Sequence, residues 1–143
     1  MGNRQRRGSH TVSWLTAHIV FVTKYRYKVF RGNVQRRIRE LLIQICESED
    51  VEILKGIVNK DHVHMHIEYP PKVSISDLVK RLKGKSSRRI QKEYPAIRKR
   101  FLGDRIWSME YGVWSTGNIT NKMIEDYLES LGKQKDKDEA FES

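Results

Sequence analysis

The hydrophobic residues of this chain recur with two periods, and in the first third they predict a strand followed by a helix. Residues 12–23 (VSWLTAHIVFVT) are rich in β-branched and aromatic side chains, with apolar residues at alternate positions, as in a half-buried strand. Helical spacing follows Gly32 and predicts a helix that runs to about Ser48. The strand positions are Leu15, Ala17, Ile19 and Phe21, and the helix positions are Val34, Ile38, Leu41, Leu42 and Ile45.

Two further strands are predicted directly after this helix. Residues 51–58 (VEILKGIV) have the composition of a strand, and residues 61–69 (DHVHMHIEY) have the same alternation of side chains. The connection between them is short enough for a β-hairpin. Pro70 and Pro71 end the third strand, because proline has no backbone N–H to donate to a sheet.

The rest of the chain predicts a second helix, a fourth strand and a third helix. Ser74 is a candidate N-cap for an amphipathic helix, and a loop around Pro95 follows that helix. Residues 106–115 (IWSMEYGVWS) then have the pattern of a strand, and a last apolar stripe runs at helical spacing from about Thr120 to Leu131. The second helix has its apolar residues at Ile75, Leu78, Val79, Leu82 and Ile90.

This order of elements, β-α-β-β-α-β, is that of the ferredoxin-like split fold of the α+β class. It predicts an antiparallel sheet with two helices on one face, the other face left available, and one additional C-terminal helix that carries Tyr127. We expect a single domain over residues 11–132, a basic arm over residues 1–10 and a charged, disordered tail over residues 133–143.

Three of the five histidines of the chain lie at alternate positions of the predicted third strand. His62, His64 and His66 therefore share one face of that strand, and neighbouring members are about 6.7 Å apart along it, close enough for two imidazoles to bind one ion. The intervening apolar residues would face the core. A polar, solvent-facing strand is the alternative interpretation of this pattern.

The charge of the chain favours a polyanionic partner. There are 28 Lys and Arg against 18 Asp and Glu, which gives +10, and the acidic excess after Thr120 leaves +13 on residues 1–119. A basic surface that serves only solubility is the alternative. No apolar run reaches the roughly 20 residues of a membrane span, and the single cysteine, Cys46, suits a reducing compartment. We therefore expect no membrane partner and a cytoplasmic protein.

A metal ion with open coordination positions on a basic surface suits a phosphate oxygen as a further ligand. Such a site needs a nucleophile, for which serine, cysteine and tyrosine side chains are candidates. Tyr127 stands out because its helix is additional to the basic fold, although a tyrosine on an apolar helical stripe is more often a core residue.

Several segments together resemble the single-tyrosine transposases of insertion sequences, the two-hundred/six-hundred-and-five type with a His-hydrophobic-His motif. The matching segments are AHIVFVTKYRYKVF (residues 17–30), DHVHMHIEYPP (61–71), LVKRLKGKSSRRI (78–90) and YGVWSTGNITNKMIEDYLES (111–130). They cover most of residues 11–132 in the family's order.

The resemblance implies a homodimer that cuts and rejoins single-stranded DNA at element ends marked by hairpins. His62 and His64 would hold a divalent ion, Mg²⁺ or Mn²⁺, and Tyr127 would attack the phosphate and keep the 5′ end as a phosphotyrosine. Each active site would be composite, with the tyrosine helix of one subunit facing the histidines of the other. The protein would be nucleoid-associated when bound to DNA in a prokaryotic cell.

One position departs from the family pattern. The family's metal site usually adds a glutamine one helical turn after the tyrosine, and this chain has Leu131 there. Gln134 lies about 10.5 Å further along the helix axis than Tyr127, too far for an easy substitute. We expect His66 or water to fill the vacancy, and an inactive copy of the transposase is the alternative.

Two basic segments are candidates for binding the DNA. The turn after the first strand interleaves basic residues with aromatic rings that can stack on bases, and the second helix carries a Lys-Gly-Lys-Ser-Ser motif with further arginines. Solvated surfaces are the alternative interpretation of both. The candidates are Lys24, Tyr25, Arg26, Lys28, Lys83, Lys85, Ser86, Ser87 and Arg88.

Two rival functions remain at this stage. The same strand order underlies RNA-recognition domains, so a non-catalytic nucleic-acid-binding protein is one of them. Its sheet would normally offer stacking aromatic rings where this chain offers histidines. The other is a domesticated relative of the transposases that acts on hairpin repeats dispersed in its host.

Overall fold

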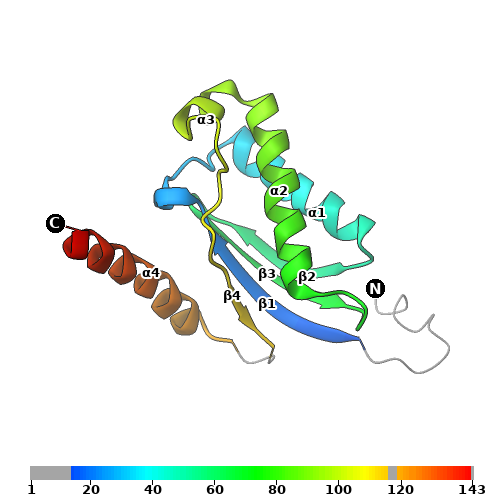
Figure 1. Ribbon diagram of the computed structural model, residues 1–143. Helices are drawn as coiled ribbons and strands as arrows, with labels where there is room; N and C mark the ends of the chain where they lie inside the picture. Colours follow the sequence, from blue (N-terminus) through cyan, green and yellow to red (C-terminus); the bar gives the residue numbers. More distant parts are fainter. Residues whose placement is uncertain (1–13, 116–118, 143) are drawn as a thin grey trace.

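The computed structural model describes residues 14–115 and 119–142, with side chains as far as Leu131. Four strands form one antiparallel sheet in the order β2-β3-β1-β4, with α1 and α2 together on one side of it, as Figure 1 shows. The strands are β1 (Leu15–Val22), β2 (Glu52–Val58), β3 (His62–Tyr69) and β4 (Gly112–Trp114). The helices are α1 (Asn33–Ser48), α2 (Ile75–Glu93), α3 (Pro95–Arg100) and α4 (Asn121–Glu142), and a 3-10 turn, η2, covers Lys24–Arg26.

The order of these elements confirms the predicted ferredoxin-like fold with an additional C-terminal helix. The first three strands and the first two helices begin and end within a few residues of the predicted positions. Ser74 caps α2 as expected, because its hydroxyl accepts a hydrogen bond from the Asp77 amide at 3.4 Å.

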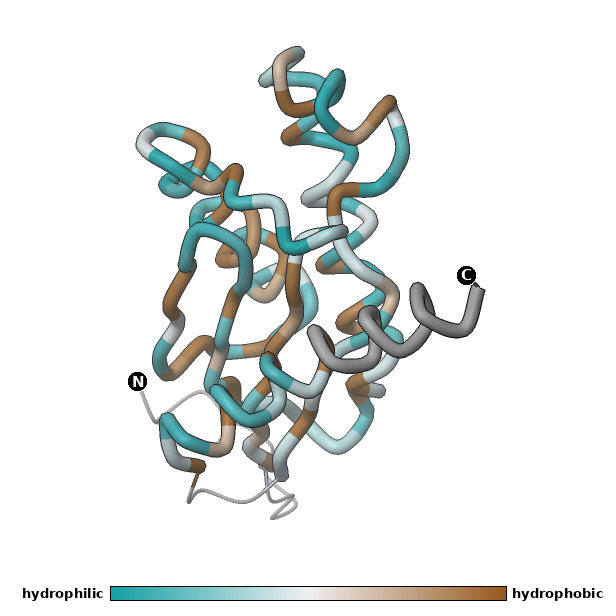
Figure 2. Tube along the Cα trace, turned by 90° about the vertical axis from the view of Figure 1, so that its left-hand side faces the viewer, coloured by the Kyte–Doolittle hydropathy of each residue, from teal (hydrophilic) through white to brown (hydrophobic). Residues whose placement is uncertain are grey.

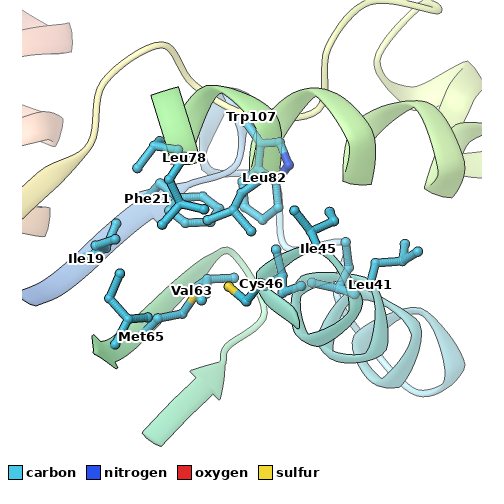
Figure 3. Packing of buried hydrophobic residues seen from close by; sticks show 14 of the residues in the cluster. Ile19, Phe21, Leu41, Ile45, Cys46, Val63, Met65, Leu78, Leu82 and Trp107 are labelled. Carbon is cyan, nitrogen blue, oxygen red and sulfur yellow. The ribbon is translucent and has the colours of Figure 1, made fainter. Parts of the chain in front are cut away.

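The core lies between the sheet and the helix pair α1 and α2. The side chains of β1 and β3 alternate between the two sheet faces, so Ala17, Ile19 and Phe21 point to the same side as the apolar residues of β3. Figure 2 shows how hydrophobic and hydrophilic residues are interspersed along the chain. Figure 3 shows how Phe21, Val63 and Met65 meet Leu41, Leu78 and Leu82 from the helices. Burying these side chains fixes which face of β3 is left for the histidines.

The predicted fourth strand is wrong in length, since only Gly112–Trp114 pair with β1. The residues just before it run along the end of β1, where Trp107 forms an isolated bridge with Thr23. The hydrogen-bonding partners of this segment include side chains of α2, where a longer strand would have a neighbouring strand. The loop expected around Pro95 is also wrong in part, because Pro95 starts the short helix α3, a position that suits proline.

The C-terminal helix continues into the segment for which the sequence predicts a charged, disordered tail. α4 begins at Asn121 and continues to Glu142, so the residues that we expected to form a disordered tail are helical up to that point. Lysine, glutamate and glutamine are good helix formers, which is why a charged tail can extend a helix. The basic arm, residues 1–10, lies outside the described residues. None of the described helices is long and apolar enough to cross a membrane.

Candidate active site on the histidine face of the sheet

The three predicted histidines share one face of β3, as the alternation indicated. All three are partly buried, while Val63 and Met65, the two residues between them, are fully buried on the opposite face. The register with β1 places Val22 opposite His62, Val20 opposite His64 and His18 opposite His66. The surface formed by His62, His64 and His66 with His18 is called the histidine face below.

His62 is held in one tautomer by its two neighbours. Its Nδ1 donates to the Asp61 carboxylate at 2.9 Å, and its Nε2 lies 2.8 Å from the side-chain amide nitrogen of Asn59. Because an amide nitrogen can only donate, Nε2 must carry a lone pair. A lone pair on one ring nitrogen with a carboxylate on the other is the state of a metal-binding histidine.

His18 is a member of the histidine face that our sequence analysis missed. Its Nδ1 lies 3.1 Å from His64 Nε2, and its ring stacks on His66 with centroids 4.0 Å apart and planes 5° from parallel. The Nε2 atoms of His18 and His66 are buried and have no hydrogen-bond partner among the described residues. His18 has the opposite parity to Ala17 and Ile19, which signals its face, but only the register of β1 against β3 brings it to His66.

The histidine face favours neutral imidazoles. Burial, with smaller effects of His66 and His64, lowers the pKa of His18 to about 4. Burial also lowers the pKa of His64, and His66, His62 and Lys55 add to the effect. A neutral imidazole is the form that can bind a cation, so His18 and His64 are in the protonation state that cation binding requires.

Tyr127 lies on the same face of the sheet as His64. Val20 of β1 is paired with His64 on one side and with Gly112 of β4 on the other, so side chains at all three positions point the same way. A Cβ atom built on Gly112 would lie 3.2 Å from Cζ of Tyr127. The tyrosine ring therefore covers Gly112, in the same cross-strand row as His64 and two strands, about 10 Å, away from it.

The environment of the Tyr127 ring is apolar. Trp114 packs against it edge to face, with ring centroids 5.6 Å apart. The phenol oxygen is buried without a hydrogen-bond partner among the described residues, and burial, with a smaller effect of Glu110, raises the pKa of Tyr127 to about 12. In this arrangement the phenol is protonated at neutral pH.

The described residues do not form a complete protein cage for a metal ion. No group of three or more His, Cys, Asp or Glu side chains within them is arranged to hold one. The Nε2 atom of His64 is hydrogen-bonded to His18 and that of His62 to Asn59, so both candidate ligand atoms have a protein partner in this conformation. Leu131 is partly buried on α4, and the side chain of Gln134 lies outside the described residues.

The basic turn after β1 connects the histidine strand to the tyrosine helix. Arg26 donates through Nε to the Asp61 carboxylate at 3.1 Å, with Nη2 paired to the same oxygen at 3.0 Å, and its Nη1 donates to the carbonyl oxygen of Leu128 at 3.4 Å. Tyr25 and Lys28 are exposed, and Lys24 forms an ion pair with Asp104 at 2.6 Å. Of the four predicted DNA contacts in this turn, Arg26 is thus also a structural link.

The Lys-Gly-Lys-Ser-Ser motif of α2 divides into buried and exposed members. Ser86 and Ser87 are buried, and their hydroxyls accept hydrogen bonds from Trp107 Nε1 at 2.9 Å and from the Ile106 amide at 3.1 Å. Ser86 also donates to the Leu82 carbonyl oxygen, so its hydroxyl is fully used within the fold. Ser87 accepts from Gln91 as well, and its contact with a phosphate stays a prediction. Lys83 is partly buried as well, and its Nζ donates to the carbonyl oxygens of residues 108–110 at 2.8 to 3.2 Å. Lys85 and Arg88 are exposed.

Three comparisons with known proteins agree on one family. The family model described as "Transposase IS200 like" matches residues 11–131. The transposase of insertion sequence IS200 from Salmonella typhimurium is 37% identical over 111 residues, which are 78% of this chain and 72% of that protein. The ISDra2 transposase TnpA of Deinococcus radiodurans is 32% identical over 125 residues, 87% of this chain and 89% of that protein.

Solved structures give the same result for the fold. A crystal structure assigned as a transposase from Deinococcus radiodurans superimposes with a TM-score of 0.79 at 30% identity, over 86% of this chain and 95% of that one. The structure of a REP-associated tyrosine transposase bound to a REP hairpin has a TM-score of 0.54 at 14% identity, over 85% of this chain and 65% of that one, and supports the fold alone. The matched segments include the histidine strand and the tyrosine helix, and this chain belongs to the IS200-like transposase family.

Proposed function

We propose that this chain is a metal-dependent tyrosine transposase that cleaves and rejoins single-stranded DNA at hairpin-marked ends. The observation that carries the proposal is the position of Tyr127 on the histidine face, in one cross-strand row with His64. The hairpin bound to a related transposase and the net charge of +10 support DNA as the substrate.

The nucleophile in this proposal is the Tyr127 oxygen. It attacks the phosphorus of the scissile phosphate, a bond between phosphorus and the tyrosine oxygen forms, and the bond from phosphorus to the 3′ oxygen breaks. The phenol proton passes to solvent, and the departing 3′ oxygen takes up a proton. The 5′ phosphotyrosine conserves the phosphodiester energy, so attack by another 3′ hydroxyl rejoins the strand without ATP.

His62 and His64 would hold the divalent ion, Mg²⁺ or Mn²⁺. The fit rests on the lone pair at His62 Nε2 and on the lowered pKa of His64. When bound, the ion would polarise and orient the scissile phosphate. Asp61 contributes by keeping the His62 proton on Nδ1, and Arg26 keeps the Asp61 carboxylate in place.

We further propose a homodimer with composite active sites. The support is geometric: within one chain Tyr127 lies two strands, about 10 Å, from His64, and its phenol oxygen is buried. A second subunit whose α4 supplied its own Tyr127 would bring a phenol to the histidines. Mixing Tyr127→Phe with His64→Ala protein would restore cleavage if sites are shared, because each mixed dimer retains one intact site.

The first experiment is incubation with hairpin DNA from the flanks of the gene, labelled at the 5′ or the 3′ end, with Mg²⁺ or Mn²⁺. A protein-linked DNA band on a denaturing gel is expected for the wild type and for Tyr94→Phe, a control tyrosine that packs against the core. Tyr127→Phe and His64→Ala should remove the band. DNA binding without an adduct under any metal would contradict the proposal and favour a catalytically inactive DNA-binding protein, which Leu131 also favours.

A further inference from the structure

A basic groove lies on the helix side of the molecule, away from the histidine face. It runs between α2 and the segment that leads from α3 to β4, which Figure 1 shows passing alongside α2, and encloses about 850 Å³. That volume is within the range of sites that hold small organic ligands. This cavity is called the α2 groove below.

The charge of the α2 groove is strongly one-sided. Six lysines and arginines line it against one carboxylate, Asp104, which already forms an ion pair with Lys24. Within the part of the chain whose side chains are described, neither Arg88 nor Arg98 forms an ion pair, and both are exposed. The cationic residues are Lys80, Lys83, Arg88, Lys92, Arg98 and Arg105.

Apolar side chains line the α2 groove beside these charges. The accessible apolar surface comes from Met109, which is 75% exposed, and from the partly buried Tyr111, while Val79 and Trp107 lie buried behind them. An apolar surface surrounded by cations matches the chemistry of a nucleotide, whose base stacks on apolar and aromatic surfaces while its phosphates pair with Lys and Arg.

The wall of the α2 groove is built by the family motif itself. Lys83 holds the carbonyl groups of residues 108–110, and Ser86 and Ser87 bond to residues 106 and 107. Burial lowers the pKa of Lys83 to about 8, against a smaller opposing effect of Glu110. Lys83 is therefore part of the wall, and the exposed arginines are left to meet a ligand.

Gly84 is a second, independent sign of a ligand. It lies inside α2, where glycine is less favourable than alanine, yet a Cβ atom added to it would meet nothing within 4 Å. Packing within the chain therefore does not explain this glycine. It lines the α2 groove, where the absence of a side chain leaves room for a ligand to approach the helix closely.

From these observations we propose that the α2 groove binds an unpaired segment of DNA, with bases over the apolar lining and phosphates on Arg88 and Arg98. This inference rests on the proposed function, because it assumes the same substrate. The segment that forms one wall of the α2 groove leads directly into β4, where the ring of Tyr127 packs over Gly112. A DNA strand held in the groove would thus lie across the β4 edge of the sheet from the tyrosine.

The test uses the full-length protein and a fluorescent oligothymidylate, with binding followed by anisotropy at several salt concentrations. Gly84→Trp should raise the dissociation constant about tenfold or more, because one lost stacked base weakens binding by about that factor. Gly84→Ala should raise the dissociation constant by a smaller factor, because a methyl group intrudes less on the close approach of the ligand. Arg88→Glu with Arg98→Glu should weaken binding and reduce its salt dependence more than a control pair on α1, Arg36→Glu with Arg39→Glu, which are exposed outside the groove. Circular dichroism verifies that each variant is folded.

A second measurement locates the DNA directly. Iodouracil placed in the unpaired segment should crosslink on illumination to Met109 or Tyr111, as mass spectrometry of the digested protein would show. Crosslinks confined to the histidine face and the Lys24–Lys28 turn, together with equal affinities for Gly84→Trp and Gly84→Ala, would overturn the inference. An adduct on Tyr127 without crosslinks in the α2 groove would reject DNA binding in the groove and leave the proposed cleavage chemistry intact. Crosslinks in the groove without an adduct would reject the cleavage chemistry and leave the DNA-binding groove intact.

Discussion

Arg26 donates a hydrogen bond from Nε to Asp61 Oδ2 at 3.1 Å and pairs with the same oxygen through Nη2 at 3.0 Å, and the other oxygen of this carboxylate accepts the Nδ1 proton of His62. The guanidinium also reaches the carbonyl oxygen of Leu128, the residue after Tyr127. A side chain of the basic turn thus contacts both halves of the candidate site. A lysine could not replace it, because an ammonium group lacks the planar pair of donors.

We expect Arg26→Lys to lower the rate of adduct formation up to about tenfold, because it loosens Asp61, the carboxylate that orients His62, and loss of such a carboxylate costs about tenfold or more. The rate is measured with labelled hairpin DNA on denaturing gels. Arg31→Lys, in the same basic segment but bonded only to the Lys28 carbonyl, is the matched control. Equal rates for the two variants would contradict the role of Arg26.

The raised pKa of Tyr127 predicts how stability depends on alkaline pH. The phenol has a pKa of about 12 in the folded chain against 10 when unfolded, so the unfolded chain loses this proton first as pH rises. The contribution of Tyr127 to stability is therefore complete below pH 10 and is lost as pH rises from 10 towards 12. The free energy of unfolding in urea should fall less steeply over this range in Tyr127→Phe than in the wild type. Parallel curves would show that the phenol is not buried in solution.

Two glycines predict opposite effects of the same substitution. Neither Gly84 nor Gly103 has an atom within 4 Å of an added Cβ, but Gly103 has a φ of +76° and Gly84 is helical. Gly84→Ala should raise the free energy of unfolding by about 0.5–1 kcal/mol. Gly103→Ala should lower it by about 1–2 kcal/mol, because a Cβ is strained at positive φ. Denaturant unfolding of both variants checks the signs, and destabilisation by Gly84→Ala would mean that the helix is not formed at that position.

Ser86 is predicted to matter for stability through its partner. Ser86→Ala leaves the Nε1 proton of the buried Trp107 without its acceptor, which costs about 1–3 kcal/mol. Ser76→Ala, at an exposed position of the same helix, should change stability by less than about 0.5 kcal/mol. Urea unfolding followed by tryptophan fluorescence compares the two. A neutral Ser86→Ala would indicate that water reaches the indole.

Leu131→Gln tests whether the missing family ligand limits the reaction. An amide oxygen one helical turn after Tyr127 would add the ligand that the resemblance implies, so the Mn²⁺ concentration that supports half-maximal adduct formation should fall. Leu131→Asn, whose side chain is shorter, is the control. If Leu131→Gln raises that concentration instead, the metal site of this chain is completed in another way.

The sequence predicted the histidine face because alternation in a strand is a local property. His62, His64 and His66 needed no knowledge of neighbouring strands, and neither did the apolar residues that face the core. His18 could not be assigned to the same cluster in this way, because its contact with His66 depends on the register between two strands that are far apart in the chain. The position of Tyr127 over Gly112 likewise depends on a contact between two different elements, which a local pattern does not reveal.

The Lys-Gly-Lys-Ser-Ser motif shows a different limit of prediction from the sequence. Hydroxyl and ammonium groups beside a helix glycine are equally suited to phosphates and to a neighbouring backbone, and composition does not separate the two. Only the course of residues 106–110 beside α2 decides that Ser86, Ser87 and Lys83 bond to the chain itself. In that segment the backbone meets the end of β1 in a single bridge between Trp107 and Thr23, and regular pairing begins at Gly112, so the fourth strand is shorter than its pattern indicated.

Gly112 restricts how this protein can vary. A Cβ atom there would lie 2.8 Å from the Trp114 ring and 3.2 Å from the ring of Tyr127, so even alanine would displace one of the two aromatic side chains. A lineage that acquired a larger residue at position 112 would have to shift the tyrosine or lose it. Positions 112 and 127, on different elements and separated by a connecting segment, are thus expected to change together or not at all as such transposases diverge.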